Sequence, residues 1–292
     1  MGRFRRSGSP RSSAPPSSGR QLTTKRRSEG RRAVLAAIVS TLVAFAVLAF
    51  AIVKSPGWNE IHSQFFSWQE FRSTFPEILS AFWLNVKIFC IAEACILPLA
   101  LLLAVVRSLP GPVFFPARLL AIFYTDFFRG VPTIIVITLL GFGAPALGLR
   151  GVPTSTTFWG IVALVLVYTA YVSEVYRAGI ESVHPSQASA ARSLGLNHGQ
   201  SMLYVIVPQA VRRVIPPLLN DFIGLQKDTA LVGVLGSIEA FKQTQIDQAA
   251  SFNFTSGLVA AFLFVLITIP LARFTDYLVA RDRRRQLAGA TV

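Results

Sequence analysis

Charge is scarce in this sequence, and so are the motifs of several enzyme classes. Only 14% of the 292 residues are charged, whereas soluble domains average about a quarter. The sequence contains no Gly-x-x-x-x-Gly-Lys-Ser/Thr loop, no His-Glu-x-x-His pair and no serine nucleophile elbow, so it offers none of the sites that those motifs build. We therefore expect a protein that is not an enzyme by itself and that draws any energy it needs from a partner or an ion gradient.

Cysteine and histidine are also rare. Cys90 and Cys95 lie five residues apart in one apolar segment, a spacing that puts them on different faces of a helix. We interpret them as packing residues and not as a disulfide. The three histidines, His62, His184 and His198, are too scattered to predict a metal site.

Acidic residues are half as common as basic ones, which gives a net charge of +14. The basic residues fall in blocks beside apolar segments, as in the loops of membrane proteins. They do not cover one globular face, so the charge does not predict a nucleic-acid partner.

What the sequence has in abundance is apolar residues, at 52%. The first apolar run, residues 33–53, has no charge and is long enough to span about 30 Å of hydrocarbon. A signal peptide has an apolar region of only about 7–15 residues, so we expect a retained transmembrane helix. Residues 1–32, rich in Arg, Ser, Pro and Gly, are expected to be a disordered basic tail.

The rest of the chain predicts an all-α polytopic membrane protein with about six transmembrane helices. Residues 54–81 are polar and aromatic and are expected to form an interfacial loop with a short amphipathic helix. A five-helix core should occupy 82–280, followed by a basic tail over 281–292. Its five spans are expected at about Phe82–Val106, Leu119–Phe142, Thr157–Tyr176, Pro217–Ile238 and Gly257–Val279.

The distribution of Lys and Arg predicts the orientation of these spans. If the N-terminus is cytoplasmic, the inner segments hold 21 basic residues and the outer loops hold four. Because basic residues favour cytoplasmic loops, both termini and the segment 177–216 are expected in the cytoplasm.

Several charges fall inside the expected spans, where a charge costs a few kcal/mol or more. Asp126 with Arg129, and Glu174 with Arg177, have the three-residue spacing that allows pairing on one helix face. Lys227 and Asp228 are adjacent and must point in different directions. These groups either fix helix packing or line a path for a polar solute. The path candidates are Asp126, Arg129, Glu174, Lys227 and Asp228.

The cytoplasmic segment 177–216 contains signals for two short helices. Pro185 suits the first position of a helix, and Gly195 can end it in a left-handed conformation. Asn197 and Gln200 have the spacing of a capping box for a second helix, which Pro208 is expected to end. The small residues between Pro185 and Gly195 predict a surface that another protein can approach closely. A solvated cytoplasmic loop is the alternative.

This segment also carries a resemblance. Ser189-Ala190-Ala191-x-x-x-Gly195, nine residues and then Val205-Ile206-Val207-Pro208 resembles the EAA signature of permease subunits in ATP-binding cassette importers. The spacing matches throughout, although Ser189 replaces the usual Glu.

Further matches resemble the polar amino-acid branch of that family, the histidine/glutamine-type permeases. They are Phe128-Arg129-Gly130-Val131-Pro132, Glu174-Val175-Tyr176-Arg177-Ala178-Gly179-Ile180, Pro208-Gln209-Ala210-Val211-Arg212-Arg213 and Lys227-Asp228-Thr229.

The resemblance implies a type I importer permease fold and a multi-pass protein of the bacterial inner membrane. It implies that polar amino acids are imported. The implied partners are a cytoplasmic ATPase dimer, which binds the ATP, a second permease subunit and an extracytoplasmic solute-binding protein. No cofactor is expected on this chain. The implied ATPase-coupling residues are Ser189, Ala190, Ala191, Arg192, Gly195 and Pro208.

Two alternatives compete with this interpretation. An ion-coupled secondary transporter would use Asp126, Glu174 and Asp228 as proton or sodium sites, but it has no need of a small-residue docking helix. A membrane scaffold without transport would leave the charges in the spans without a use.

Overall fold

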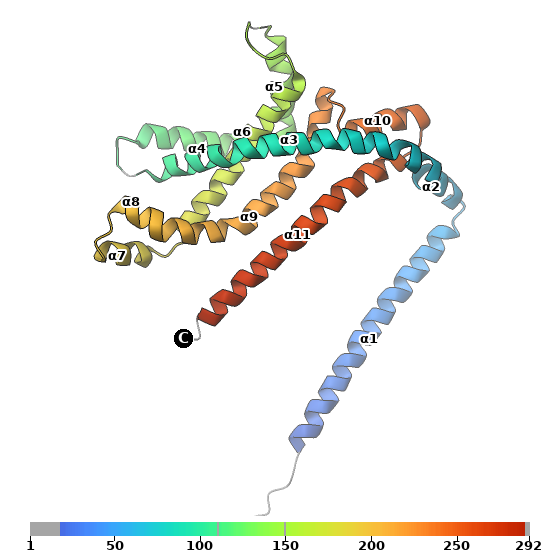
Figure 1. Cartoon of the computed structure of the whole chain (residues 1–292). Helices are drawn as coiled ribbons and strands as arrows, with labels where there is room; N and C mark the ends of the chain where they lie inside the picture. The colour runs from blue at the N-terminus through green and yellow to red at the C-terminus, as the bar shows by residue number, and fades with distance from the viewer. Residues whose placement is uncertain (1–17, 110, 149, 290–292) are drawn as a thin grey trace, which may run out of the picture. The chain divides into compact units, whose positions relative to one another are not determined.

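The computed structural model describes residues 18–109, 111–148 and 150–289, with side chains from residue 34 to residue 281 apart from 110, 149 and 198. Within these ranges every regular element is a helix. In chain order the elements are α1 (Ser18–Val53), α2 (Trp58–Phe65), α3 (Trp68–Ser108), α4 (Phe115–Gly130), α5 (Thr133–Ala146), α6 (Thr156–Glu181), α7 (Pro185–Ser193), α8 (His198–Ser201), the π-helix η1 (Met202–Ile206), α9 (Val207–Asp228), the 3₁₀-helix η2 (Thr229–Leu235), α10 (Ala240–Ser251) and α11 (Thr255–Gly289) (Figure 1).

The chain forms two units, residues 1–61 and 62–292. In the first unit, α1 contains the apolar stretch Val34–Val53, none of which is buried in the protein. Ser40 and Thr41 both donate to the carbonyl of Ala37, at 3.0 and 2.7 Å, so their hydroxyls are satisfied within an apolar helix. The helix begins at Ser18, ahead of the expected start of the first span. Residues 1–17 of the expected tail, and the last three of the C-terminal tail, lie outside the described residues.

The expected number of spans is confirmed. Five helical stretches in the described residues are long and apolar enough to cross a membrane, and a bent pair of helices would give a sixth. The second long helix, α3, begins at Trp68 instead of Phe82, because the Ser67 side chain accepts a hydrogen bond from the Glu70 amide and caps it. The expected interfacial loop therefore contains α2 and the first turns of α3.

The third expected span, Leu119–Phe142, corresponds to a bent pair of helices. It consists of α4 and α5, which meet at an angle of 101°. Pro132 has no amide hydrogen to continue the helix, and the residue before a proline is driven to extended geometry. Val131 accordingly has φ −92° and ψ 130°.

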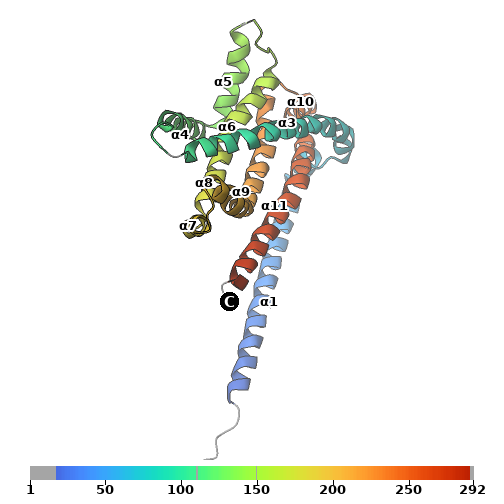
Figure 2. The ribbon, with the colours of Figure 1, turned by 60° about the vertical axis from the view of Figure 1, so that its left-hand side comes forward.

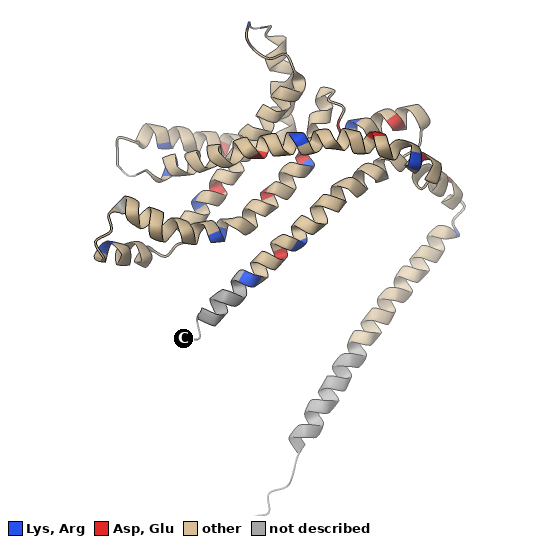
Figure 3. Cartoon of the chain, in the orientation of Figure 1, with Lys and Arg blue, Asp and Glu red and all other residues tan. Residues whose placement is uncertain are grey.

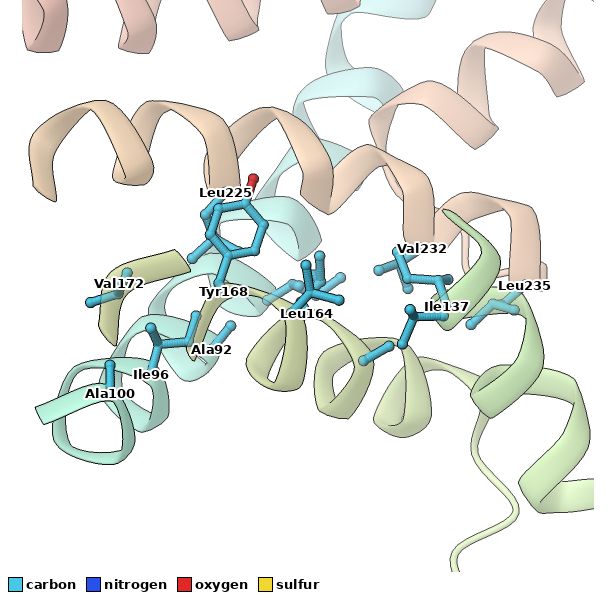
Figure 4. Packing of buried hydrophobic residues seen from close by; sticks show 14 residues of the cluster. Ala92, Ile96, Ala100, Ile137, Leu164, Tyr168, Val172, Leu225, Val232 and Leu235 are labelled. Atoms are coloured by element: carbon cyan, nitrogen blue, oxygen red, sulfur yellow. The ribbon is translucent and has the colours of Figure 1, made fainter. Parts of the chain in front are cut away.

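The centre of the second unit is α6, which packs against α3, α5 and α9. Apolar residues four apart on α3 and on α6 give each helix a buried stripe. Figure 4 shows these side chains meeting residues of α5, α9 and η2. The labelled residues of this core are Ala92, Ile96, Ala100, Ile137, Leu164, Tyr168, Val172, Leu225, Val232 and Leu235.

A smaller apolar cluster lies where the first half of α3 meets α10 and α11. Phe82 of α3 packs edge-on against Phe264 of α11, with ring centroids 5.0 Å apart. Figures 1 and 2 both show α3 running across α6, α9 and α11. This long helix therefore connects the part of the unit that carries α10 with the part that carries the segment 177–216.

Candidate functional site

Charged residues are sparse along the helices of the core (Figure 3), and Glu174 of α6 is the centre of their main ion-pair network. One carboxylate oxygen accepts from Arg107 of α3, and the other accepts from Arg177 at 2.7 Å. Arg177 also pairs with Glu181 at 2.6 Å, while Arg107 lies 3.4 Å from the hydroxyl of Thr125 on α4. The expected Glu174–Arg177 pair is confirmed. The expected span ends at Val106, which leaves Arg107 in a loop. In the structure α3 continues to Ser108, so Arg107 lies on the helix and reaches Glu174.

The expected pair of Asp126 and Arg129 is wrong. No ion pair joins them in the described part of the chain, and both side chains are exposed on α4. The Arg129 guanidinium instead lies 5.9 Å from the centroid of the Tyr171 ring on α6. A cation over an aromatic face is attracted by the ring quadrupole, so Arg129 joins α4 to the neighbouring helix and not to its own.

Lys227 and Asp228 point in different directions, as their adjacency predicts. Asp228 accepts a hydrogen bond of 2.9 Å from the Tyr168 hydroxyl of α6. Lys227 is exposed and lines a cleft of 380 Å³ together with Phe241 and Gln248 of α10 and residues of α11. The two residues therefore serve different interfaces of the core.

Two further acids lie on the interface of α3 and α9. Phe89 packs edge-on against Phe222 with ring centroids 6.2 Å apart; Glu93 follows Phe89 by one helical turn, and Asp221 precedes Phe222. One carboxylate oxygen of each acid is buried and has no hydrogen-bond partner among the described residues. Both acids lie in apolar spans of the sequence, and a charge in such a span is the feature that could have marked them as functional candidates. Neither acid was predicted to have a role.

Glu239, between η2 and α10, was missed by the sequence because it begins an apparently polar loop. Its side chain is fully buried. One oxygen accepts from Asn85 of α3 at 3.0 Å and from the Phe241 amide at 2.8 Å, and the other accepts from the Lys242 amide at 2.7 Å. Asn85 in turn accepts from the Ala240 amide at 3.0 Å. Burial raises the pKa of the Glu239 carboxyl, while these hydrogen bonds oppose the rise.

The segment from Pro185 to Pro208, which we call the coupling segment, has the local geometry that its sequence predicts. Pro185 is the first residue of α7, and His184 caps that helix. Gly195 ends it with φ +87°, a conformation that favours glycine. Asn197 and Gln200 exchange reciprocal hydrogen bonds of 2.8 and 3.0 Å, which confirms the capping box.

The two central alanines of α7 face opposite ways. Ser189, Ala190 and Arg192 are exposed, whereas Ala191 is only 3% exposed and packs inside the chain. Leu194, which follows α7, is 84% exposed. The surface available to a partner is therefore the side of α7 that carries Ser189 and Ala190, with an apolar residue beside it.

Pro208 does not end the second helix, contrary to expectation. The chain passes from α8 through η1 into α9, and Pro208 lies in the first turn of α9. In η1 the backbone is widened, and the Val207 amide bonds the carbonyl of Met202, five residues back. A π-helical turn adjusts the hydrogen-bond pattern, so a residue without an amide hydrogen is accommodated where an α-helix would break.

Comparison with known proteins places this arrangement in a family. Residues 96–284 match the family described as binding-protein-dependent transport system inner membrane component. The probable glutamine ABC transporter permease protein GlnM of Bacillus subtilis (strain 168) is 35% identical over 170 residues, which cover 58% of this chain and 77% of GlnM. The arginine transport system permease protein ArtQ of the same organism is 32% identical over 216 residues, or 73% of this chain and 96% of ArtQ.

Comparison with solved structures gives a consistent result. A chain in the crystal structure of an amino acid ABC transporter with histidines is 28% identical, covers 74% of this chain and 98% of its own length, and superposes with a TM-score of 0.66. A chain of the MetNI methionine ABC transporter, at 18% identity and a TM-score of 0.56, shares the fold. The chain thus belongs to the binding-protein-dependent inner membrane components: it is the membrane-spanning permease subunit of an ABC importer, not itself an enzyme, and it works with an ATPase on a separate chain and with a permease partner.

Proposed function

We propose that this permease imports a polar amino acid that an extracytoplasmic solute-binding protein delivers, and that its coupling segment docks on the ATPase. The similarity to permeases named for glutamine and arginine supports the solute class. The same relatives give no support to an ion-coupled carrier.

The observation that carries the docking proposal is the exposed side of α7. Ser189 and Ala190 are small and exposed, so a partner's surface can approach the helix backbone closely. Gly195 fixes the turn that follows, and the Arg192 side chain is exposed at the last turn of the helix. Pro208 sits where the segment rejoins α9. The segment is therefore a small-residue projection, which suits insertion into a groove.

The orientation follows from charge. The segments 1–32, 107–118, 177–216 and the C-terminal region from Arg273 hold 21 of the 28 basic residues, and basic loops stay cytoplasmic. We propose that both termini and the coupling segment face the cytoplasm, where the ATPase is. Reaction of a cysteine at Arg192 with an impermeant reagent added outside intact cells would exclude this orientation.

The solute path is proposed along the charged groups of the core. Lys227 lines a cleft and Asp228 is held by Tyr168, Glu174 belongs to an ion-pair network, and Asp126 and Arg129 are exposed on α4. Charged groups of both signs suit amino acids, which carry both an ammonium and a carboxylate.

The docking proposal is tested with Ala190→Trp. The exposed indole should block the approach of the ATPase, so the ATPase should no longer co-purify and uptake in proteoliposomes should stop. Ala250→Trp, at an exposed alanine of α10, is the matched control and should leave both unchanged. Ala191→Trp is a poor test, because that alanine is buried in its own chain. Normal co-purification of the Ala190→Trp variant would refute docking through α7.

The solute class is tested by uptake of labelled glutamine, arginine, histidine and a sugar into proteoliposomes containing the permease, its ATPase and a loaded binding protein. ATP-dependent uptake confined to amino acids is expected. Uptake by the permease alone under a proton or sodium gradient would favour the secondary-carrier alternative.

A further inference from the structure

The coupling segment leaves α6 and returns to α9 close to the same point. Only Ser182, Val183 and His184 join α6 to α7, and Val183 is buried. On the return side, α9 packs along α6. The base of the projection is therefore the crossing of α6 with α9.

That crossing depends on the absence of a side chain at Gly179. A Cβ atom at this position would lie 2.1 Å from Cγ1 of Val214 and 3.5 Å from the carbonyl oxygen of Ala210. Val214 is itself only 4% exposed. The two helices touch here with no space for an added methyl group, because a gap of 2.1 Å is far below van der Waals contact.

A hydrogen bond reinforces the same crossing. The guanidinium of Arg213 donates to the carbonyl oxygen of Ser182, the residue that caps the C-terminal end of α6. A cation at a helix C-terminus satisfies a free carbonyl and opposes the helix dipole. Arg213 thus connects the first half of α9 to the point where the coupling segment begins.

Just beyond the crossing, α9 contains Pro216 and Pro217. Each proline removes one backbone hydrogen bond to the preceding turn, so helix bending is easiest at this pair. A cleft of 350 Å³, lined by Pro217, Gly179 and Arg213 among others, lies beside it. Bending of α9 is therefore easiest just past the crossing, where the helix continues into the core.

We infer that Gly179, Ser182, Arg213 and Val214 form a clamp that makes the end of α6, the coupling segment and the start of α9 one rigid lever. The inference rests on the proposed docking of the coupling segment. Movement of the ATPase then moves α6 and α9 together. Without the clamp, the coupling segment and the start of α9 move without α6, and the ATPase works without moving the core.

The first test changes the packing of the clamp. Gly179→Ala should leave the ATPase bound but lower, several-fold, the amount of solute imported per ATP hydrolysed. Val214→Ala in the same chain removes the methyl groups that clash and should restore the ratio. Gly143→Ala, at a helical glycine of α5 with open space around it, is the matched control and should keep the wild-type ratio.

The second test changes the hydrogen bond. Arg213→Ala should lower the solute-to-ATP ratio and the stimulation of ATPase activity by the loaded binding protein, and Arg213→Lys should restore part of both. Arg212→Ala removes the same charge from the exposed neighbouring position and should change neither.

Three results would overturn the clamp: a normal ratio in both Gly179→Ala and Arg213→Ala, failure of Val214→Ala to rescue, or loss of ATPase binding in parallel with the ratio. The last result would mean that the crossing only shapes the docking surface. Failure of the docking proposal is separate, because it appears as normal ATPase binding in Ala190→Trp.

Discussion

Two acids in different parts of the core, Glu174 and Glu239, accept hydrogen bonds from different kinds of partner. Glu174 lies near the coupling segment, is 18% exposed and accepts from two arginine side chains. Glu239 is fully buried before α10 and accepts from Asn85 and from two backbone amides. None of the four ion pairs among the described residues includes Glu239.

The difference lies in how easily the partners can change. Arginine side chains are long and can rotate to another acid. Arg177 already forms ion pairs with both Glu174 and Glu181. Backbone amides at the start of α10 are fixed by the helix they belong to. We conclude that the α10 end is built to keep one geometry, whereas the side-chain partners of Glu174 are able to rearrange.

The largest effect is expected from breaking the Glu239 network with Asn85→Leu. The change removes a donor to a buried carboxylate and leaves the Ala240 amide without its acceptor. The lost hydrogen bond to the carboxylate alone costs about 1.5–3 kcal/mol, so the melting temperature in detergent should fall sharply. Asn220→Leu, at an exposed position of α9, should cause little change. A wild-type melting curve for Asn85→Leu would show that the network does not stabilise the fold.

The contrast also explains which parts the sequence could predict. Local signals were reliable where neighbouring residues decide the structure: Gly195 has the positive φ that a helix end requires, and Asn197 with Gln200 forms a capping box. The spans followed from runs of apolar residues, because length and hydrophobicity alone decide whether a helix can cross a membrane.

Contacts between distant segments were not predictable. Glu239 is 154 positions from Asn85 in the sequence, and nothing near it indicates burial. Arg129 was expected to bond on its own helix and instead lies over Tyr171. Pro208 was expected to end a helix, but a π-helical turn precedes it. In the first two cases packing of another element decided the outcome, and in the third the hydrogen-bond pattern of the preceding π-helix did.

An intermediate effect is expected at the other acid. Glu174→Gln removes the charge that both Arg107 and Arg177 contact and should cost about 1 kcal/mol, since the site is partly exposed. Glu181→Gln breaks a pair whose acid is 62% exposed, and exposed pairs contribute only about 0.2–1 kcal/mol. Glu174→Gln should therefore lower both the melting temperature and uptake more than Glu181→Gln does. Equal effects would mean that Arg107 adds nothing to the network.

A smaller effect is expected on α4. Cation–π contacts at exposed sites contribute about 0.5–1 kcal/mol, so Arg129→Gln and Tyr171→Leu should each destabilise slightly, and the double variant should show that their effects are not additive. Asp126→Asn, which breaks no ion pair in the described structure, should leave stability unchanged. Additive effects of Arg129→Gln and Tyr171→Leu would exclude the contact. If Asp126→Asn nonetheless changes which amino acids are imported, that carboxylate belongs to the solute path.

The smallest effect is expected in the pH dependence of stability, and it concerns Glu239. Burial raises the pKa of this carboxyl in the folded protein, so in the unfolded chain it ionises at a lower pH, near the ordinary pKa of about 4.3. The stability that the group contributes is therefore fully present below that value and is lost as pH rises through the raised pKa of the folded state.

In Glu239→Gln this component should disappear, although the variant should also be less stable at every pH, because the amide nitrogen of Gln faces a donor. The comparison is thus between the slopes of melting temperature against pH above about pH 4, and not between the melting temperatures themselves. Because Glu174 and its arginines are left intact, a difference in slope isolates the acid before α10. Identical slopes would mean that the hydrogen bonds from Asn85 and the two amides fully offset the cost of burying the charge.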